Sequence, residues 1–216
     1  MESERQTARI ELPRLPIRVI EIPIIGESEL ITHAWSDKAK KEMLDKQLGK
    51  ARLKKAPKNP WNDFTESLYW LSPKPDPVTE KDIAEGRFGF PTIGFKAAAV
   101  GAIRQVQGMK MTEARIAFHV LGEFAEIMGT PRMREDMVRL QTGVADIRYR
   151  AGFPEWSTTL RAQYHESGIS LEQLLNLFQL AGFGPGVGDW RPERDGGFGR
   201  FRLEGAALIG EEEVAD

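Results

Sequence analysis

A glycine- and arginine-rich stretch near the end of the chain, AGFGPGVGDWRPERDGGFGRFRLEG (181–205), holds the residue types best suited to binding an anion. Glycines let a backbone approach a phosphate closely, and Arg191, Arg194 and Arg200 would supply positive charge. A phosphate cradle for a nucleotide cofactor, a bulged connection without a ligand, and the wall of a groove for a polyanion all have this composition. The elements on either side decide which of them is possible.

A helix precedes this stretch and a strand follows it. SGISLEQLLNLFQLAG (167–182) predicts a helix that begins with a capping box of Ser170 and Gln173 and ends at Gly182. FGRFRLE (198–204) alternates apolar and basic residues, which is typical of a strand. A dinucleotide-binding turn runs the other way, from a strand into a helix, and no Gly-Lys-Ser/Thr of a P-loop is present. We therefore expect no cofactor, while the bulged connection and the groove wall both stay open.

The remaining pattern predicts one domain over residues 1–216 with an α+β fold. Its main elements run strand, helix, strand, strand, helix, strand, which is the ferredoxin-like (RRM-like) βαββαβ order. They are a strand at 16–24, a helix that starts near 92, strands at 113–122 and 156–164, the helix at 170–182 and the last strand. Two large insertions interrupt this core at 28–91, with a basic helical segment, and at 123–155, with a hairpin that turns near Thr142-Gly143. An acidic tail, 205–216, follows.

Composition excludes several classes of protein. The net charge of −2 gives no overall attraction to nucleic acid or membrane, and the absence of cysteine excludes disulfides and thiolate metal sites. His33, His119 and His165 lack metal-ligand spacing, so we expect no metal. No apolar run reaches the roughly 20 residues of a membrane span, and no signal pattern opens the chain, so we expect a cytoplasmic protein without a membrane partner.

The segment 37–58 is locally basic, with nine lysines and arginines against three acidic residues. Helix-forming residues predict a helix over 37–55 with a thin apolar stripe. Facing a groove, its lysines would add salt-sensitive affinity for nucleic acid, and Lys40, Lys54 and Lys55 are the residues we select for this role. A solvated charged helix explains the same composition. Trp35 beside it is suited to stacking on a base, although packing inside the protein is the commoner fate of tryptophan.

Three stretches, in order, resemble motifs of the repeat-associated mysterious protein (RAMP) superfamily, and in particular the backbone subunit of CRISPR effector complexes. FPTIGFKAAAVGAIR (90–104) resembles the family's PGSSLKGALR pattern, with Gly94, Lys96 and Arg104 in matching places. MREDMVRLQTGVA (133–145) resembles a hairpin with an arginine–aspartate–x–valine start, and GVGDWRPERDGGFGRFRLE (186–204) resembles the terminal glycine-rich loop with its GxGRF end. The segment 35–55 has no counterpart in those subunits, which suggests a phage or prophage relative in a bacterial host cell.

The resemblance implies a ferredoxin-like core that holds single-stranded RNA or DNA by its backbone and assembles head-to-tail with copies of itself into a filament. It implies nucleic-acid-binding roles on the first helix, on a thumb-like hairpin and in the glycine-rich loop, with Trp190 as a second stacking residue. The residues concerned are Lys96, Arg104, Arg134, Arg139, Arg148, Arg191, Arg194 and Arg200. Solvent exposure of Lys96 and Arg104, and pairing of the hairpin arginines with nearby carboxylates, are the alternatives.

No catalytic residue is predicted, and we expect a binding protein rather than an enzyme. Glu27 and Glu29 lie in the turn where some relatives place a backbone-cleaving aspartate, but the residue type differs. Three alternatives stay open beside the filament: a phage single-strand DNA annealing or recombination protein, a metal-dependent ribonuclease that uses an acidic residue of this turn or His33, and a structural phage protein without nucleic-acid binding.

Overall fold

The computed structural model describes residues 15–50, 57–139, 143–205 and 207–210 of the 216-residue chain. Lys54 and Lys55, two of the predicted binding residues, lie outside these ranges, as do most residues of the acidic tail. The described residues form an α+β structure with antiparallel sheets, so the predicted α+β class is confirmed.

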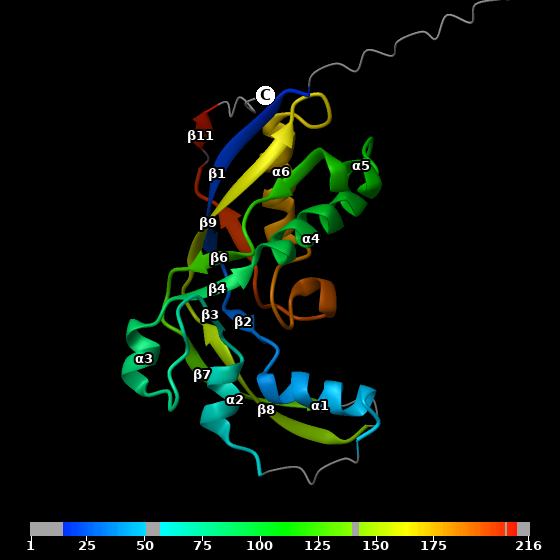
Figure 1. Ribbon diagram of the computed structural model, residues 1–216. Helices are drawn as coiled ribbons and strands as arrows, with labels where there is room; N and C mark the ends of the chain where they lie inside the picture. The colour runs from blue at the N-terminus through cyan, green and yellow to red at the C-terminus, as the bar shows by residue number, and fades with distance from the viewer. Residues whose placement is uncertain (1–14, 51–56, 140–142, 206, 211–216) are drawn as a thin grey trace, which may run out of the picture.

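The largest sheet has the strand order β10-β1-β9-β5, and every neighbouring pair is antiparallel. A short strand, β11, also pairs with β1. Helices α4 and α6 pack against each other on one side of this sheet (Figure 1). The elements of this layer are β1 (Ile17–Gly26), α4 (Thr92–Ala102), β5 (Phe118–Val120), β9 (Ser157–His165), α6 (Leu171–Phe183), β10 (Phe201–Leu203) and β11 (Ala207–Gly210).

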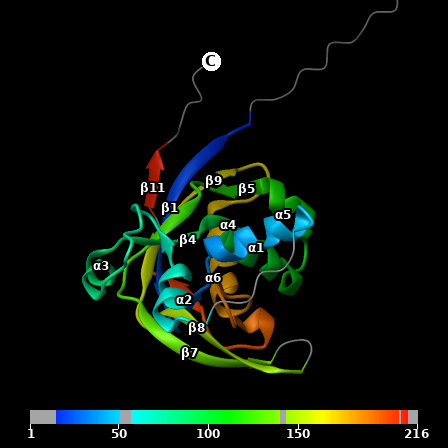
Figure 2. The same ribbon diagram turned by 60° about the horizontal axis from the view of Figure 1, so that its bottom comes forward.

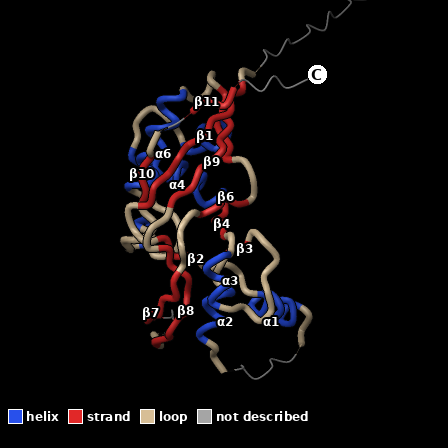
Figure 3. Tube along the Cα trace, turned by 90° about the vertical axis from the view of Figure 1, so that its left-hand side faces the viewer, coloured by secondary structure: helices blue, strands red, loops and turns tan. Residues whose placement is uncertain are grey.

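Two three-stranded sheets form the rest of the molecule, with the orders β2-β8-β7 and β3-β4-β6. The β7–β8 hairpin extends away from the largest sheet, and α1, α2 and α3 lie at the same end of the molecule (Figures 1 and 3). The strands are β2 (Leu30–Thr32), β3 (Tyr69–Trp70), β4 (Phe88–Pro91), β6 (Phe124–Ile127), β7 (Arg132–Arg139) and β8 (Ala145–Phe153). The remaining helices are α1 (Asp37–Gln47), α2 (Pro60–Glu66), α3 (Glu80–Glu85), α5 (Met111–Ala117) and the 3₁₀ turns Ile103–Gln105 and Pro192–Arg194.

The core lies between the largest sheet and the two long helices. Every second residue of β1 points into it, with Ile20, Ile22 and Ile24 almost fully buried. Small residues of α4 let the helix approach the sheet closely, since Ala99 and Ala102 have no exposed surface. Burial of these alternating side chains supplies the main driving force for this layer.

Three predicted elements differ from those observed. Residues 113–122 do not form one strand: α5 occupies the first part because Ala114 and Ala117 pack inward, and β5 begins only at Phe118. The basic helix stops at Gln47, before Gly49, which has a φ of 68°. In the tail segment 205–216, residues 207–210 pair with β1 as β11.

The helix of 170–182 begins with the predicted capping box but ends one residue later, at Phe183. Gly182 therefore lies inside α6 rather than at its end. A Cβ at this position would overlap the backbone carbonyl of Phe201, so glycine is needed for the close contact between α6 and β10. Its role is packing, not the left-handed cap that the sequence suggested.

Candidate functional site

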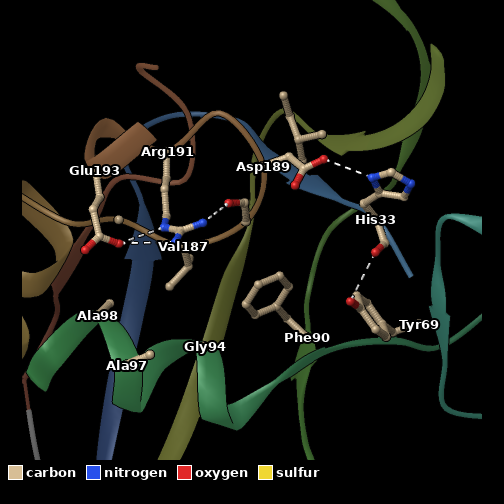
Figure 4. A pocket seen from close by; sticks show the side chains of 13 residues that line it. His33, Tyr69, Phe90, Gly94, Ala97, Ala98, Val187, Asp189, Arg191 and Glu193 are labelled. Carbon is tan, nitrogen blue, oxygen red and sulfur yellow. Dashed lines mark hydrogen bonds and ion pairs between the residues drawn. The ribbon is translucent and has the colours of Figure 1, made fainter. Parts of the chain in front are cut away.

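A cleft of about 230 Å³ lies between the glycine-rich loop and α4. One wall is loop backbone from Gly186 to Asp189, and the opposite wall is the first two turns of α4 with Gly94, Ala97 and Ala98 (Figure 4). His33, Tyr69 and Phe90 close one end, and Arg191 and Glu193 close the other. Both long walls therefore present backbone and small side chains.

The loop is folded back on itself, and its glycines are required for this shape. Gly186, Gly188 and Gly199 have φ values of 64°, 81° and 66°, in the left-handed region that favours glycine. The amide of Val187 donates to the carbonyl of Gly199 at 3.0 Å, and a Cβ on Gly199 would overlap the Val187 carbonyl. The amide of Gly199 in turn donates to the backbone carbonyl of Glu29 at 2.8 Å. The bare wall of the cleft is thus held in place by backbone hydrogen bonds.

At one end of the cleft a single carboxylate, that of Glu193, contacts two arginines. Arg191 donates to it from Nε and Nη2 at 3.3 and 3.2 Å and to the carbonyl of Gly188 at 3.2 Å, and Arg104 donates from Nη2 at 3.0 Å. Burial raises the pKa of Glu193, but these arginines outweigh it and hold the pKa below its ordinary value. The charge of both arginines is therefore partly balanced within the protein.

At the other end His33 and Asp189 meet. His33 Nδ1 lies 3.1 Å from Asp189 Oδ2, and the Tyr69 hydroxyl donates to the backbone carbonyl of His33 at 3.3 Å (Figure 4). Burial raises the pKa of Asp189, but hydrogen bonds from His33 and from Arg150 outweigh it and lower the pKa overall. The pKa of Tyr69 is raised, mainly by burial and also by the nearby charge of Asp189. Asp189 is thus an anion held by two donors.

A chain of ion pairs connects the hairpin to this end of the cleft. We call it the hairpin network, and its members are Glu29, Arg132, Arg134, Asp136, Arg150 and Asp189. Arg150 is 3% exposed and bridges Asp136 and Asp189 at 2.9 and 2.7 Å. The rings of Trp190 and Phe198 lie 4.6 Å from Arg150 and 4.8 Å from Arg134. The network therefore fixes the glycine-rich loop against the hairpin.

The predicted binding residues do not meet in one place. Lys96 lies on the flank of α4 that faces β5, away from Gly94 and Ala97, and contacts Phe118 and His119 there. Arg194 is exposed and Arg200 half-buried, and among the described residues no carboxylate contacts either side chain. These two arginines and Lys96 carry charge that the described structure leaves unbalanced.

The hairpin residues fall into two groups. Arg134 is 17% exposed and contacts Glu29 and Asp136, so its charge is balanced within the protein. The β7–β8 hairpin runs along the lower edge of the molecule in Figure 2. Arg139 is exposed near its tip, and Arg148 is half-buried on the face that carries Asp136. Lys40 is exposed on α1, and Trp35 is 64% exposed just before it, whereas Trp190 packs on Arg150. Their predicted roles stay predictions.

Sequence reasoning missed the residues that hold the site together. The partner of Arg191 could have been predicted from the sequence, because Glu193 lies only two residues further on in PERD. Nothing in the sequence, however, connects Glu29 with Arg134 or Asp189 with Arg150. Within the described part of the chain, no group of three or more histidine, cysteine, aspartate or glutamate residues is arranged to hold a metal ion. No helix of that part is long and apolar enough to cross a bilayer.

Comparison of the structure with solved structures gives matches where sequence comparison gives none. A chain of the Type III-B Cmr-beta, determined by cryo-EM bound to cognate target RNA, aligns with 91% of this chain at 10% identity and a TM-score of 0.50. The fold is similar to that of a Cmr subunit. This chain spans 62% of the length of that one. The crystal structure of Cmr6 from Pyrococcus furiosus matches with 11% identity and a TM-score of 0.43, over 88% of this chain and 100% of Cmr6.

No protein-family model matches the chain, and no curated protein matches it in sequence. The RAMP resemblance indicated by the three motifs is confirmed for the fold by the Cmr-beta match. At 10% identity this similarity concerns the fold alone.

Proposed function

We propose that this protein binds single-stranded RNA or DNA by its sugar–phosphate backbone, with one nucleotide at a time in the cleft between the glycine-rich loop and α4. The observation that carries the proposal is the composition of the two long walls: mainly glycine backbone on one and glycine and alanine on the other, with Arg191 paired to Glu193 at one end and Asp189 near the other. Bulky side chains on either wall would keep a phosphate away from the backbone.

The size and position of the cleft support part of a polymer rather than a whole cofactor. Its volume of about 230 Å³ is below the usual range for drug-sized ligands, about 300–1,000 Å³, and suits part of a polymer better than a whole cofactor. It lies against the first turns of α4, where amide groups and the helix dipole favour an anion. Arg194 and Arg200 extend the positive surface along the loop.

The fold supports two finer parts of the proposal. The order β1, α4, β5, β9, α6, β10, with α4 and α6 in contact beside an antiparallel β10-β1-β9-β5 sheet, supports a ferredoxin-like core. The projecting hairpin carries exposed Met133, Met137 and Ile147 on one face, which supports head-to-tail contact with the next copy along the strand. We propose both as parts of the same account.

Ala97 gives a sharp test, because its exposed side chain lines the cleft. Ala97→Glu places a carboxylate beside the proposed phosphate path, whereas Ala97→Gln adds nearly the same volume without charge. Fluorescence anisotropy with labelled single-stranded RNA and DNA should show salt-dependent binding by the wild type. Ala97→Glu should have an affinity about tenfold lower than that of Ala97→Gln. Equal losses in the two variants would place the strand elsewhere, and an absence of wild-type binding to either strand would refute the proposed function.

Assembly and turnover are tested separately. Particle images with and without a long single strand should show a helical row of subunits only when the strand is present, and isolated particles in both samples would contradict assembly.

We propose binding without cleavage, so labelled RNA incubated with the protein and Mg²⁺ should be recovered intact. Cleavage that disappears in Glu27→Ala would instead favour a metal-dependent ribonuclease.

A further inference from the structure

Lys96 and His119 form a pair of basic side chains on the flank of α4 that faces β5. Lys96 Nζ lies 3.1 Å from His119 Nδ1 and 5.8 Å from the centre of the Phe118 ring. Lys96 is half-buried and His119 is exposed, so the pair lies at the surface with its lysine stem covered. The cleft lies on the other flank, lined by Gly94, Ala97 and Ala98.

The surroundings of this pair are basic or neutral. On β9, Gln163 lies opposite His119, and its neighbours on the same face of the strand are Arg161 and His165. Among the described residues, the charged side chain that contacts His119 from another element is Lys96 of α4. Arg115 of α5, three residues before β5, is exposed. On that face of the sheet, Glu21 of β1 lies opposite Arg161. Among the described residues, no carboxylate contacts Lys96 or His119.

The contact itself fixes the protonation state of the pair in the absence of a ligand. A lysine ammonium can only donate, so His119 must accept with a neutral Nδ1. Protonation of His119 would remove this hydrogen bond and place two cations about 3 Å apart. Burial, and then the charge of Lys96, lower the pKa of His119, while burial lowers that of Lys96. Both pKa directions agree with a site that lacks an anion.

We propose that Lys96 and His119 form a phosphate site for a second position of the strand that occupies the cleft, and that binding there takes up one proton at His119. A phosphate oxygen between the two side chains would separate them and accept from Lys96 Nζ and from Nδ1–H of His119, and its negative charge would favour the imidazolium form that Lys96 alone disfavours. This inference rests on the proposed function, because the strand is the source of the phosphate. The two flanks of α4 would then hold successive parts of one strand.

The direction of the pH effect follows from proton linkage. The pKa of His119 is depressed without the strand and would be raised by a bound phosphate, so the complex holds more protons than the free protein between these two values. Affinity therefore rises as the pH falls through this window. Above the pKa of the complex the proton contributes nothing, and binding depends on the remaining cations.

The chain has three histidines, so the proton can be assigned to one residue. Wild-type affinity for a fluorescent oligouridylate should rise about tenfold from about pH 8 to about pH 5.5. His119→Gln keeps an acceptor for Lys96 but cannot take up the proton, so its affinity should change less than about twofold over the same range. The matched control, His165→Gln, should keep the wild-type pH dependence. The full pH dependence in His119→Gln would overturn the inference.

Two further measurements keep the test decisive if a variant is poorly folded. The imidazole NMR signals of the wild-type protein should give His119 a pKa that is higher with the oligonucleotide than without it, and an unchanged value would overturn the inference. Lys96→Gln should lose affinity most at low pH. Wild-type protein that binds no strand at any pH refutes the proposed function itself, whereas binding that is independent of His119 refutes only this site.

Discussion

The hairpin network and the flanks of α4 use the same kinds of cation in opposite ways. In the network, Arg132, Arg134 and Arg150 all contact carboxylates, and Arg150 is almost fully buried between two of them. At α4 and the adjoining loop, Lys96 and Arg200 have no carboxylate contact among the described residues. The difference teaches that the number of arginines does not identify a binding surface. A cation that is already balanced fixes the structure, and one that is not balanced is available to a ligand.

Removal of a carboxylate from the network should have the largest effect on the molecule. Asp136 is 6% exposed and contacts both Arg134 and Arg150, so Asp136→Ala leaves Arg150 buried with half of its partners. We expect a loss of about 3–5 kcal/mol in the free energy of unfolding, measured by urea denaturation. Arg139→Ala, at an exposed position of the same strand, should change it by less than about 0.5 kcal/mol. A loss below about 1 kcal/mol in Asp136→Ala would show that the hairpin network does not fix the loop against the hairpin.

Two glycines of the loop give the next largest effect and control for each other. Gly199 has a positive φ and no room for a Cβ beside the Val187 carbonyl, whereas Gly197 has no atom within 4 Å of the position of a Cβ. Gly199→Ala should lose about 1–3 kcal/mol of stability and weaken strand binding, because the wall of the cleft shifts. Gly197→Ala should leave both nearly unchanged, and similar effects in the two variants would contradict the assigned loop shape.

A smaller effect is expected where the two kinds of cation meet, at Glu193. Glu193→Gln removes the negative charge that faces Arg191 and Arg104 while it keeps the size of the side chain. Both arginines then become available to a phosphate, so affinity for a single strand should increase about threefold, as measured by anisotropy at low salt. Arg87 and Glu126 form a pair away from the cleft, and Glu126→Gln serves as the control with no expected change. Weaker binding in Glu193→Gln would mean that this carboxylate positions Arg191 for the strand.

Local patterns predicted the elements with strong periodicity. The capping box and leucine spacing predicted α6, the small residues of 95–102 predicted α4, and alternation predicted β1 and β9. The prediction of a strand at 113–122 was wrong. It followed the alternation of Ile116, Phe118 and Val120 and overlooked two alanines at helical spacing, which pack inward in α5. The three-residue strand β2 and the two-residue strand β3 depend on distant partners, which leave little trace in so short a sequence.

The site was less accessible to sequence reasoning than the fold. Arginines near the glycine-rich loop were correctly placed on the loop, but nothing local showed that Glu29 would reach Arg134, 105 residues away, or that Asp189 would reach Arg150, 39 residues away. Lys96 and Gly94 lie two residues apart on one helix and therefore face different directions. Which flank of α4 faces the glycine-rich loop is set by the packing of the whole domain, which the local sequence does not show.

The most direct test of the distinction between balanced and unbalanced cations is the salt dependence of strand binding in two double variants of equal charge. Arg194→Ala with Arg200→Ala removes two cations without carboxylate contacts, whereas Arg87→Ala with Arg132→Ala removes two that contact Glu126 and Glu29. The slope of log affinity against log salt concentration should fall by about 1.4 in the first, since each lost phosphate contact on a single strand contributes about 0.7, and should stay unchanged in the second. Equal decreases in the two double variants would contradict the account.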